Sequence, residues 1–280
     1  MPAQALVGAD RLTYATFGDP AAPPAILVHG WLSHRGVWRQ TIPALQTRYF
    51  CVAVDLLGFG DSDKPAAGDY SIAAQAGRVV ALADQLGLER FTLVGHSMGG
   101  QICSYAAART APERVVRLVS VAGVVTGRLQ PMVERLVYPM VNLAAHYPSL
   151  YRLAPRLSRW SLVNRLVFNN WFYRMDVLPM DSWEIDRLMA TRPEIAISAR
   201  LAGEAIHAGN LTTHLPHVLA PTLGIYGRQD RTVPFSDGEL LQRLVPGARL
   251  AALEACGHFP MYEQTETYLE ALTGFLYMRS

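Results

Sequence analysis

Ser97 stands at the centre of the sequence Gly-His-Ser-Met-Gly, which occupies residues 95–99 between an apolar run and a stretch with helical spacing. Glycine on both sides leaves room for a sharp turn from a strand into a helix, and such a turn presents a serine hydroxyl above the sheet. The positive end of the helix dipole then faces the hydroxyl and favours negative charge developing there. This context predicts a nucleophilic serine, and the alternative is a serine that only caps a helix.

A serine hydroxyl is a weak nucleophile, so it needs a base within hydrogen-bond distance and a carboxylate that orients the base. His258 lies in a glycine-flanked loop after the last apolar run, and Asp230 follows the run Thr222–Tyr226. Since the carboxyl ends of parallel strands meet at one edge of a sheet, we expect both side chains to lie near the serine. Asp237 and Asp55 are less suitable as orienting carboxylates. We interpret the first as the N-cap of the next helix and the second as a residue that shapes a turn.

A loop near the start of the chain supplies hydrogen-bond donors. His29-Gly30-Trp31 follows the apolar run Ala25–Val28. We assign the backbone N–H groups of Trp31 and Met98 as the two donors to the oxyanion of a tetrahedral intermediate. His29 is interpreted as a structural residue that holds this loop by hydrogen bonds, because buried polar groups usually have structural partners.

Short apolar runs alternate with longer stretches of helical spacing, which is typical of a parallel sheet covered by helices on both faces. The predicted strands are Leu12–Thr16, Ala25–Val28, Phe50–Val54, Phe91–Val94, Leu118–Val121, Thr222–Tyr226 and Leu250–Leu253. The predicted helices are Val37–Leu45, Ile72–Leu86, Met98–Arg109, Gly238–Leu244 and Thr265–Tyr277. No convincing strand pattern occurs between residues 126 and 217. We therefore predict a core of residues 1–125 and 218–280 that carries a helical cap insertion, residues 126–217.

The chain resembles the α/β-hydrolase superfamily, in the serine-nucleophile branch that includes carboxylesterases, lipases, carbon–carbon bond hydrolases and cofactor-free haloperoxidases. The resemblance covers roughly residues 12–125 and 218–277, through H-G-W, D-x-x-G-x-G-x-S, G-H-S-M-G-G, G-R-Q-D-x-x-x-P and G-H-F-P-x-x-E. It implies an eight-stranded, mostly parallel sheet with a helical cap. Similar epoxide hydrolases and haloalkane dehalogenases carry aspartate where this chain has Ser97, so those two activities are not expected.

Together these residues predict hydrolysis of a carboxylic ester through an acyl-enzyme, with no metal or organic cofactor. The cap is rich in aromatic and methionine residues, which favours a medium or long apolar acyl or alcohol group, although packing of the cap against the core would need the same residues. A carbon–carbon bond hydrolase for a vinylogous diketone would share the triad but need polar cap groups, such as Arg174 or Asn170, to hold an enolate. A non-catalytic ligand receptor that keeps the fold is a further alternative.

Composition limits the other functions. A net charge of +2 and the absence of Lys/Arg runs give no indication of a nucleic-acid partner. Three cysteines without C-x-x-C spacing, and a first segment without a secretory pattern, favour a cytoplasmic protein. The apolar cap makes transient contact with a lipid surface an expectation beside an apolar ester substrate. The cap also holds ten Arg against seven Asp/Glu, an excess that suits either an acidic substrate or a solvated face. The sequence indicates no particular oligomeric state.

Overall fold

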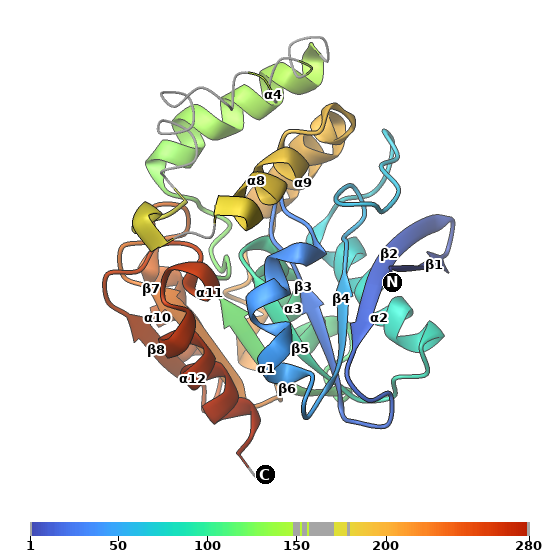
Figure 1. The fold of residues 1–280 in the computed structure, drawn as a ribbon, viewed down its shortest axis with the longest axis vertical. Coiled ribbons are helices and arrows are strands. Elements are labelled where there is room, and N and C mark those ends of the chain that lie inside the picture. The colour runs from blue at the N-terminus through green and yellow to red at the C-terminus, as the bar shows by residue number, and fades with distance from the viewer. Residues whose placement is uncertain (1, 148–151, 153–155, 157–170, 178–179, 279–280) are drawn as a thin grey trace.

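The computed structural model describes residues 2–147, 152, 156, 171–177 and 180–278, and in this part of the chain eight strands form one sheet (Figure 1). The strand order is β1-β2-β4-β3-β5-β6-β7-β8. The pairs β1–β2 and β2–β4 are antiparallel, and all other neighbours are parallel. The predicted fold class is confirmed. The strands are β1 Ala3–Val7, β2 Asp10–Phe17, β3 Pro24–Val28, β4 Phe50–Val54, β5 Phe91–His96, β6 Val115–Val121, β7 Thr222–Gly227 and β8 Arg249–Leu253.

The central strands are continuous apolar runs because helices cover both faces of the sheet. One apolar layer includes α2 (Ile72–Gln85), α3 (Met98–Tyr105) and α10 (Phe235–Leu244). The other includes α1 (Ile42–Leu45) and α12 (Thr265–Leu276). Strand β1 was absent from the sequence prediction. It lies at the sheet edge with three of its five residues exposed, so its apolar pattern is weak.

Two predicted helices are each divided into two elements in the structure. The stretch predicted as Val37–Leu45 is a 3-10 turn, η1 Arg35–Gln40, followed by the short α1, whose first turn contains Pro43. Proline is compatible with a first helical turn but not with a helix interior, so the helix starts anew there. The stretch predicted as Met98–Arg109 is α-helical to Tyr105 and then forms a π-helical turn, η2 Ala106–Thr110. A short helix, α11 Pro260–Glu263, was not predicted.

The described residues of the insertion form helices and no strand, as expected, and Figure 1 shows α4, α8 and α9 beyond one end of the sheet. Two hydrogen bonds attach α9 to loops of the core: Trp31 Nε1 donates to the Ala199 carbonyl at 2.7 Å, and Ser198 Oγ donates to the Gly58 carbonyl at 2.7 Å. The division of the chain at 126 and 217 stays a prediction. The helical elements are η3 Val133–Val137, α4 Tyr138–His146, η4 Met175–Val177, α8 Met180–Ala190, η5 Pro193–Ile195, α9 Ala196–Ala208 and η6 Leu215–His217.

Within the described ranges, no helix combines the length and the hydropathy that crossing a bilayer would need.

Glycines let β5 and α3 meet where the chain turns at Ser97. A Cβ at Gly95 would lie 2.2 Å from the Gly99 carbonyl oxygen, and a Cβ at Gly99 would lie 2.2 Å from the Val28 carbonyl oxygen. Both obstacles are main-chain atoms, one in the first turn of α3 and one at the end of β3, so neither can move aside without distorting the helix or the strand. The predicted role of these glycines, to leave space at the turn, is confirmed.

Gly99→Ala should therefore lower the free energy of unfolding by about 3 kcal/mol, the upper range for overpacking a core. The matched control is Gly77→Ala in α2, where an added Cβ meets nothing within 4 Å. That substitution should raise the free energy of unfolding by about 0.5–1 kcal/mol, because alanine is the better helix former. Urea unfolding followed by circular dichroism measures both values. Similar shifts in the two variants would show that the close approach at residue 99 does not constrain the fold.

Candidate active site

Ser97 lies at the turn between β5 and α3 with φ 55° and ψ −121°, a backbone conformation that non-glycine residues rarely adopt. The turn is fixed by main-chain hydrogen bonds: Ser97 N–H donates to the Val121 carbonyl at 2.9 Å, and the Ser97 carbonyl accepts from Gln101 N–H at 3.1 Å. The Ser97 side chain makes no capping hydrogen bond to α3. The alternative of a serine that only caps the helix is therefore wrong.

His258 and Asp230 form a buried hydrogen-bonded pair. The distance from His258 Nδ1 to Asp230 Oδ2 is 2.8 Å, and both side chains are almost fully buried. The other carboxylate oxygen, Oδ1, accepts from the main-chain N–H groups of Thr232 at 2.7 Å and Val233 at 3.0 Å. Because the carboxylate only accepts, His258 carries its hydrogen on Nδ1, and Nε2 keeps a lone pair that can take a proton.

Ser97 and His258 line the same cavity, which has a volume of about 40 Å³. It lies at the carboxyl end of β5, where the loops after the parallel strands meet. Most of its lining is apolar. The insertion contributes Leu129, Val133, Trp171, Phe172, Asp186 and Ile206 to the lining. The structure thus brings together all three residues that the sequence predicted for nucleophile, base and orienting carboxylate.

Asp186 of α8 connects the insertion to the core beside this cavity. Its Oδ1 accepts from His34 Nε2 at 2.8 Å and from Arg39 Nη2 at 2.6 Å, and its Oδ2 accepts from the Tyr262 hydroxyl at 2.9 Å. Burial alone would raise the pKa of Asp186, but the bonds from His34 and Arg39 outweigh it and hold that pKa below its ordinary value. The carboxylate therefore stays charged and ties α8 to the core.

The backbone N–H groups of Trp31 and Met98, predicted as oxyanion donors, have no acceptor within the described part of the chain. The loop that carries Trp31 is held by His29: Nδ1 donates to the Gly30 carbonyl at 2.7 Å, and Nε2 accepts from Leu56 N–H at 3.0 Å. That carbonyl belongs to the same planar peptide group as Trp31 N–H, so the bond also fixes where this N–H points. The interpretation of His29 as a structural residue of the loop is confirmed.

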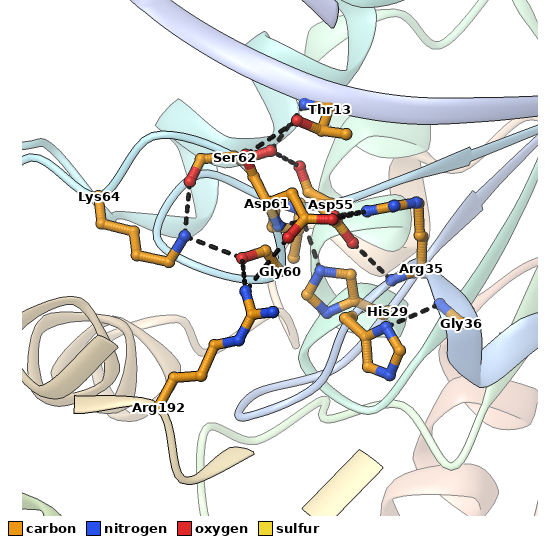
Figure 2. Close-up of polar contacts among 12 residues, drawn as sticks. Thr13, His29, Arg35, Gly36, Asp55, Gly60, Asp61, Ser62, Lys64 and Arg192 are labelled. Atoms are coloured by element: carbon orange, nitrogen blue, oxygen red, sulfur yellow. Dashed lines mark hydrogen bonds and ion pairs between the residues drawn. The ribbon is translucent and has the colours of Figure 1, made fainter. Parts of the chain in front are cut away.

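The loop after β4 supports this region through a buried carboxylate (Figure 2). Asp55 accepts from the main-chain N–H groups of Arg35 at 2.6 Å and Asp61 at 2.9 Å, and from the Arg35 guanidinium. Arg192 of the insertion donates to the Asp61 carboxylate at 3.1 Å and to the Gly60 carbonyl at 3.2 Å. Asp55 is therefore structural, as interpreted from the sequence, and its cluster joins the insertion to the core.

Asp237 has a different role from the one predicted. Helix α10 begins at Phe235 with Pro234 as its N-cap, so Asp237 lies inside the first turn and is not the cap. Its carboxylate instead accepts from the main-chain N–H groups of Val125 at 2.7 Å and Thr126 at 3.1 Å. Pro234 fixes φ at the start of α10. Asp237 is therefore not needed as a cap, and it binds the main chain just after β6.

Two residues with no role predicted from the sequence, Glu263 and His96, hold the segment of residues 256–259 that carries the base, here called the base loop. Glu263 Oε2 accepts from Gly257 N–H at 3.0 Å, Tyr173 N–H at 2.8 Å and Arg174 N–H at 2.9 Å, and its Oε1 accepts from Phe259 N–H at 3.2 Å. Burial raises the pKa of Glu263 despite these bonds. His96 contacts the base loop from the side of Ser97. The glutamate of G-H-F-P-x-x-E was visible in the sequence, but its partners are main-chain N–H groups, and two of them, from Tyr173 and Arg174, are distant in the chain.

Residues 23–265 match the family of the alpha/beta hydrolase fold, and because this match covers most of the chain, the protein belongs to that family. It is 28% identical over 255 residues to a pimeloyl-(acyl-carrier protein) methyl ester esterase of Aeromonas hydrophila, covering 91% of this chain and 95% of the relative. The crystal structure of an enol-lactonase from Burkholderia xenovorans LB400 is similar with a TM-score of 0.84 and 25% identity, covering 99% of this chain and 100% of that one. The 2-hydroxy-6-oxo-6-phenylhexa-2,4-dienoate hydrolase of Rhodococcus sp. strain RHA1 is similar with a TM-score of 0.82 and 25% identity, covering 99% of each chain.

The buried His29 predicts a pH dependence of stability. Burial lowers the pKa of His29 from 6.5 to about 4 in the folded protein, so the unfolded chain binds more protons between these values. The free energy of unfolding is therefore not lowered by His29 above pH ~6.5. It falls as the pH drops toward 4, and this group accounts for a loss on the order of 3 kcal/mol.

Urea unfolding at a series of pH values from 7 to 4, for the wild type and His29→Asn, measures this contribution. Other titrating groups affect both proteins alike, so the difference between the two slopes isolates His29. The slope of unfolding free energy against pH should be smaller in His29→Asn than in the wild type. Identical slopes would mean that His29 is not held neutral in the folded state.

Proposed function

We propose that the protein hydrolyses carboxylic esters through an acyl-enzyme, with Ser97 as nucleophile, His258 as base and Asp230 as the carboxylate that orients the base. The observation that carries the proposal is the position of the His258–Asp230 pair beside Ser97 at one cavity. The esterase relative and the enol-lactonase structure both have names that denote cleavage of an ester or lactone bond, which supports the bond type.

The steps follow from the tautomer of His258. Its Nε2 accepts the proton of the Ser97 hydroxyl while Oγ forms a bond to the ester carbonyl carbon, and the carbonyl oxygen becomes an oxyanion. The N–H groups of Trp31 and Met98 are proposed to donate to that oxyanion. When the carbonyl re-forms, the bond to the alcohol oxygen breaks and His258 gives its proton to the alcohol. Water then attacks the acyl-enzyme with the same base, which releases the acid and restores Ser97.

The cavity supports an apolar acyl or alcohol group, because its walls are largely aromatic and aliphatic. Its volume of about 40 Å³ is far below the ~300–1,000 Å³ of common ligand sites. A medium or long chain therefore fits only after side chains of the insertion move. Residues Tyr151, Trp160 and Phe168, which the sequence also places in the apolar cap, lie outside the described residues.

Carbon–carbon bond hydrolysis has less support from the site, although the Rhodococcus dienoate hydrolase has the same fold. One polar group considered for holding an enolate, Arg174, has an exposed side chain that pairs with Asp176 at 2.7 Å, and it does not line the cavity. The other, Asn170, lies outside the described residues.

Lipid contact through the cap stays a prediction. Exposed apolar side chains at Met132, Met140, Leu143 and Tyr147 occur along η3 and α4, which is compatible with it.

A panel of p-nitrophenyl esters with acyl chains of increasing length tests the proposal. The wild type should be most active with medium or long chains, since each buried methylene adds about 0.8 kcal/mol of binding. Asp230→Asn should lower kcat by about 10⁴-fold, and Ser97→Ala by on the order of 10⁶-fold. Ser104→Ala changes a buried serine of α3, the helix that follows Ser97; it serves as the matched control and should retain activity.

Four results would count against the proposal. Full activity in Ser97→Ala would remove the nucleophile, and a maximum at acetate would remove the apolar-chain preference. Turnover of a vinylogous diketone without turnover of any ester would favour the carbon–carbon bond hydrolase. No turnover of either class would favour a ligand receptor.

A further inference from the structure

His96 is the last residue of β5 and directly precedes Ser97. Its ring is buried and lines the same cavity as Ser97 and His258. His96 Nε2 lies 2.8 Å from the main-chain carbonyl oxygen of His258. Because a carbonyl oxygen only accepts, Nε2 carries the hydrogen, and the tautomer of His96 is fixed.

The other ring nitrogen of His96, Nδ1, is then an acceptor, and it has no hydrogen-bond partner among the described residues. Burial, together with the nearby His258, holds the pKa of His96 well below its ordinary value, so the ring is neutral. A buried polar atom without a partner destabilises a fold relative to an apolar side chain of the same shape. The bond from Nε2 is therefore the contact that accounts for a histidine at this position.

The main chain of His258 is held from two sides. Its N–H donates to the Trp171 carbonyl of the insertion at 3.0 Å, and its carbonyl accepts from His96. The His96 ring also packs against His258 and Phe259, each with ring centroids 4.7 Å apart. His96 sits on an interior strand of the sheet, next to the nucleophile, so it provides the direct link between Ser97 and the base loop.

We propose that His96 is a positioning residue: its Nε2–H bond to the His258 carbonyl sets the place of the base relative to the Ser97 hydroxyl. This inference rests on the proposed function, because it acts through the same nucleophile and base. Misplacement of a reacting group by about 1 Å can lower a rate by about 100-fold. Loss of the bond should therefore lower kcat, whereas KM should change little if the ring volume is kept.

His96→Gln and His96→Phe separate the hydrogen bond from the ring. The side-chain amide of glutamine can donate to the same carbonyl, and phenylalanine fills the space without a donor. We expect kcat for the best ester to fall about 30- to 100-fold in His96→Phe with KM within about threefold, and to stay within about fivefold of wild type in His96→Gln. The exposed His217→Phe is the control and should keep the wild-type kcat.

A second readout needs no ester substrate: the rate at which a fluorophosphonate labels Ser97, followed by mass spectrometry. This rate should fall in His96→Phe and recover in His96→Gln, with thermal midpoints measured for each variant. An undiminished rate in His96→Phe, or equal losses in both variants, would overturn the proposal. If the wild type labels at Ser97 but hydrolyses no ester, the proposed substrate class fails while the labelling rates still decide the role of His96. Should His96→Phe not fold, His96→Asn replaces it, because asparagine is too short to donate to the carbonyl.

Discussion

The close approach of β5 and α3 around Ser97 is the constraint on which the rest of the site depends. Main-chain atoms of Gly95, Gly99 and Val28 come so near one another that no Cβ fits between them. The chain can reverse within this space only if Ser97 adopts a left-handed backbone conformation, which costs of order 1–3 kcal/mol. The sheet and the helix together hold Ser97 in that conformation, in which its side chain makes no capping hydrogen bond to α3.

The loops that surround the serine are held by a shared device, a buried carboxylate that accepts main-chain N–H groups. Asp55 does this for the loop after β4, Asp237 for the chain leaving β6, and Glu263 for the segment around His258. In each case the carboxylate satisfies donors that would otherwise be buried without partners. These hydrogen bonds make the loops at the carboxyl ends of the strands rigid. The loops therefore keep their donors and acceptors in place without a bound substrate.

Residues whose own side-chain chemistry defines the site were predictable, whereas residues that act through main-chain contacts were not. The turn at 95–99, the order of Ser97, Asp230 and His258, and seven of the strands follow from local pattern and chain order. Asp237 was misread because an aspartate near a helix start has the same local pattern whether it caps the helix or binds a distant loop. His96 and Glu263 were not assigned because their acceptors and donors are main-chain groups, which carry no residue identity. In the proposed function, the preferred chain length would be set by side chains of the insertion, which have no local pattern of their own.

The most direct test of the central claim is to detect the acyl-enzyme. The protein would be mixed rapidly with a p-nitrophenyl ester, quenched in acid and digested, and the peptides analysed by mass spectrometry. If Ser97 is the nucleophile, the peptide that contains Ser97 gains a mass equal to the acyl group, and the same peptide of Ser97→Ala does not. Ester turnover with the acyl group on another residue would contradict that role of Ser97.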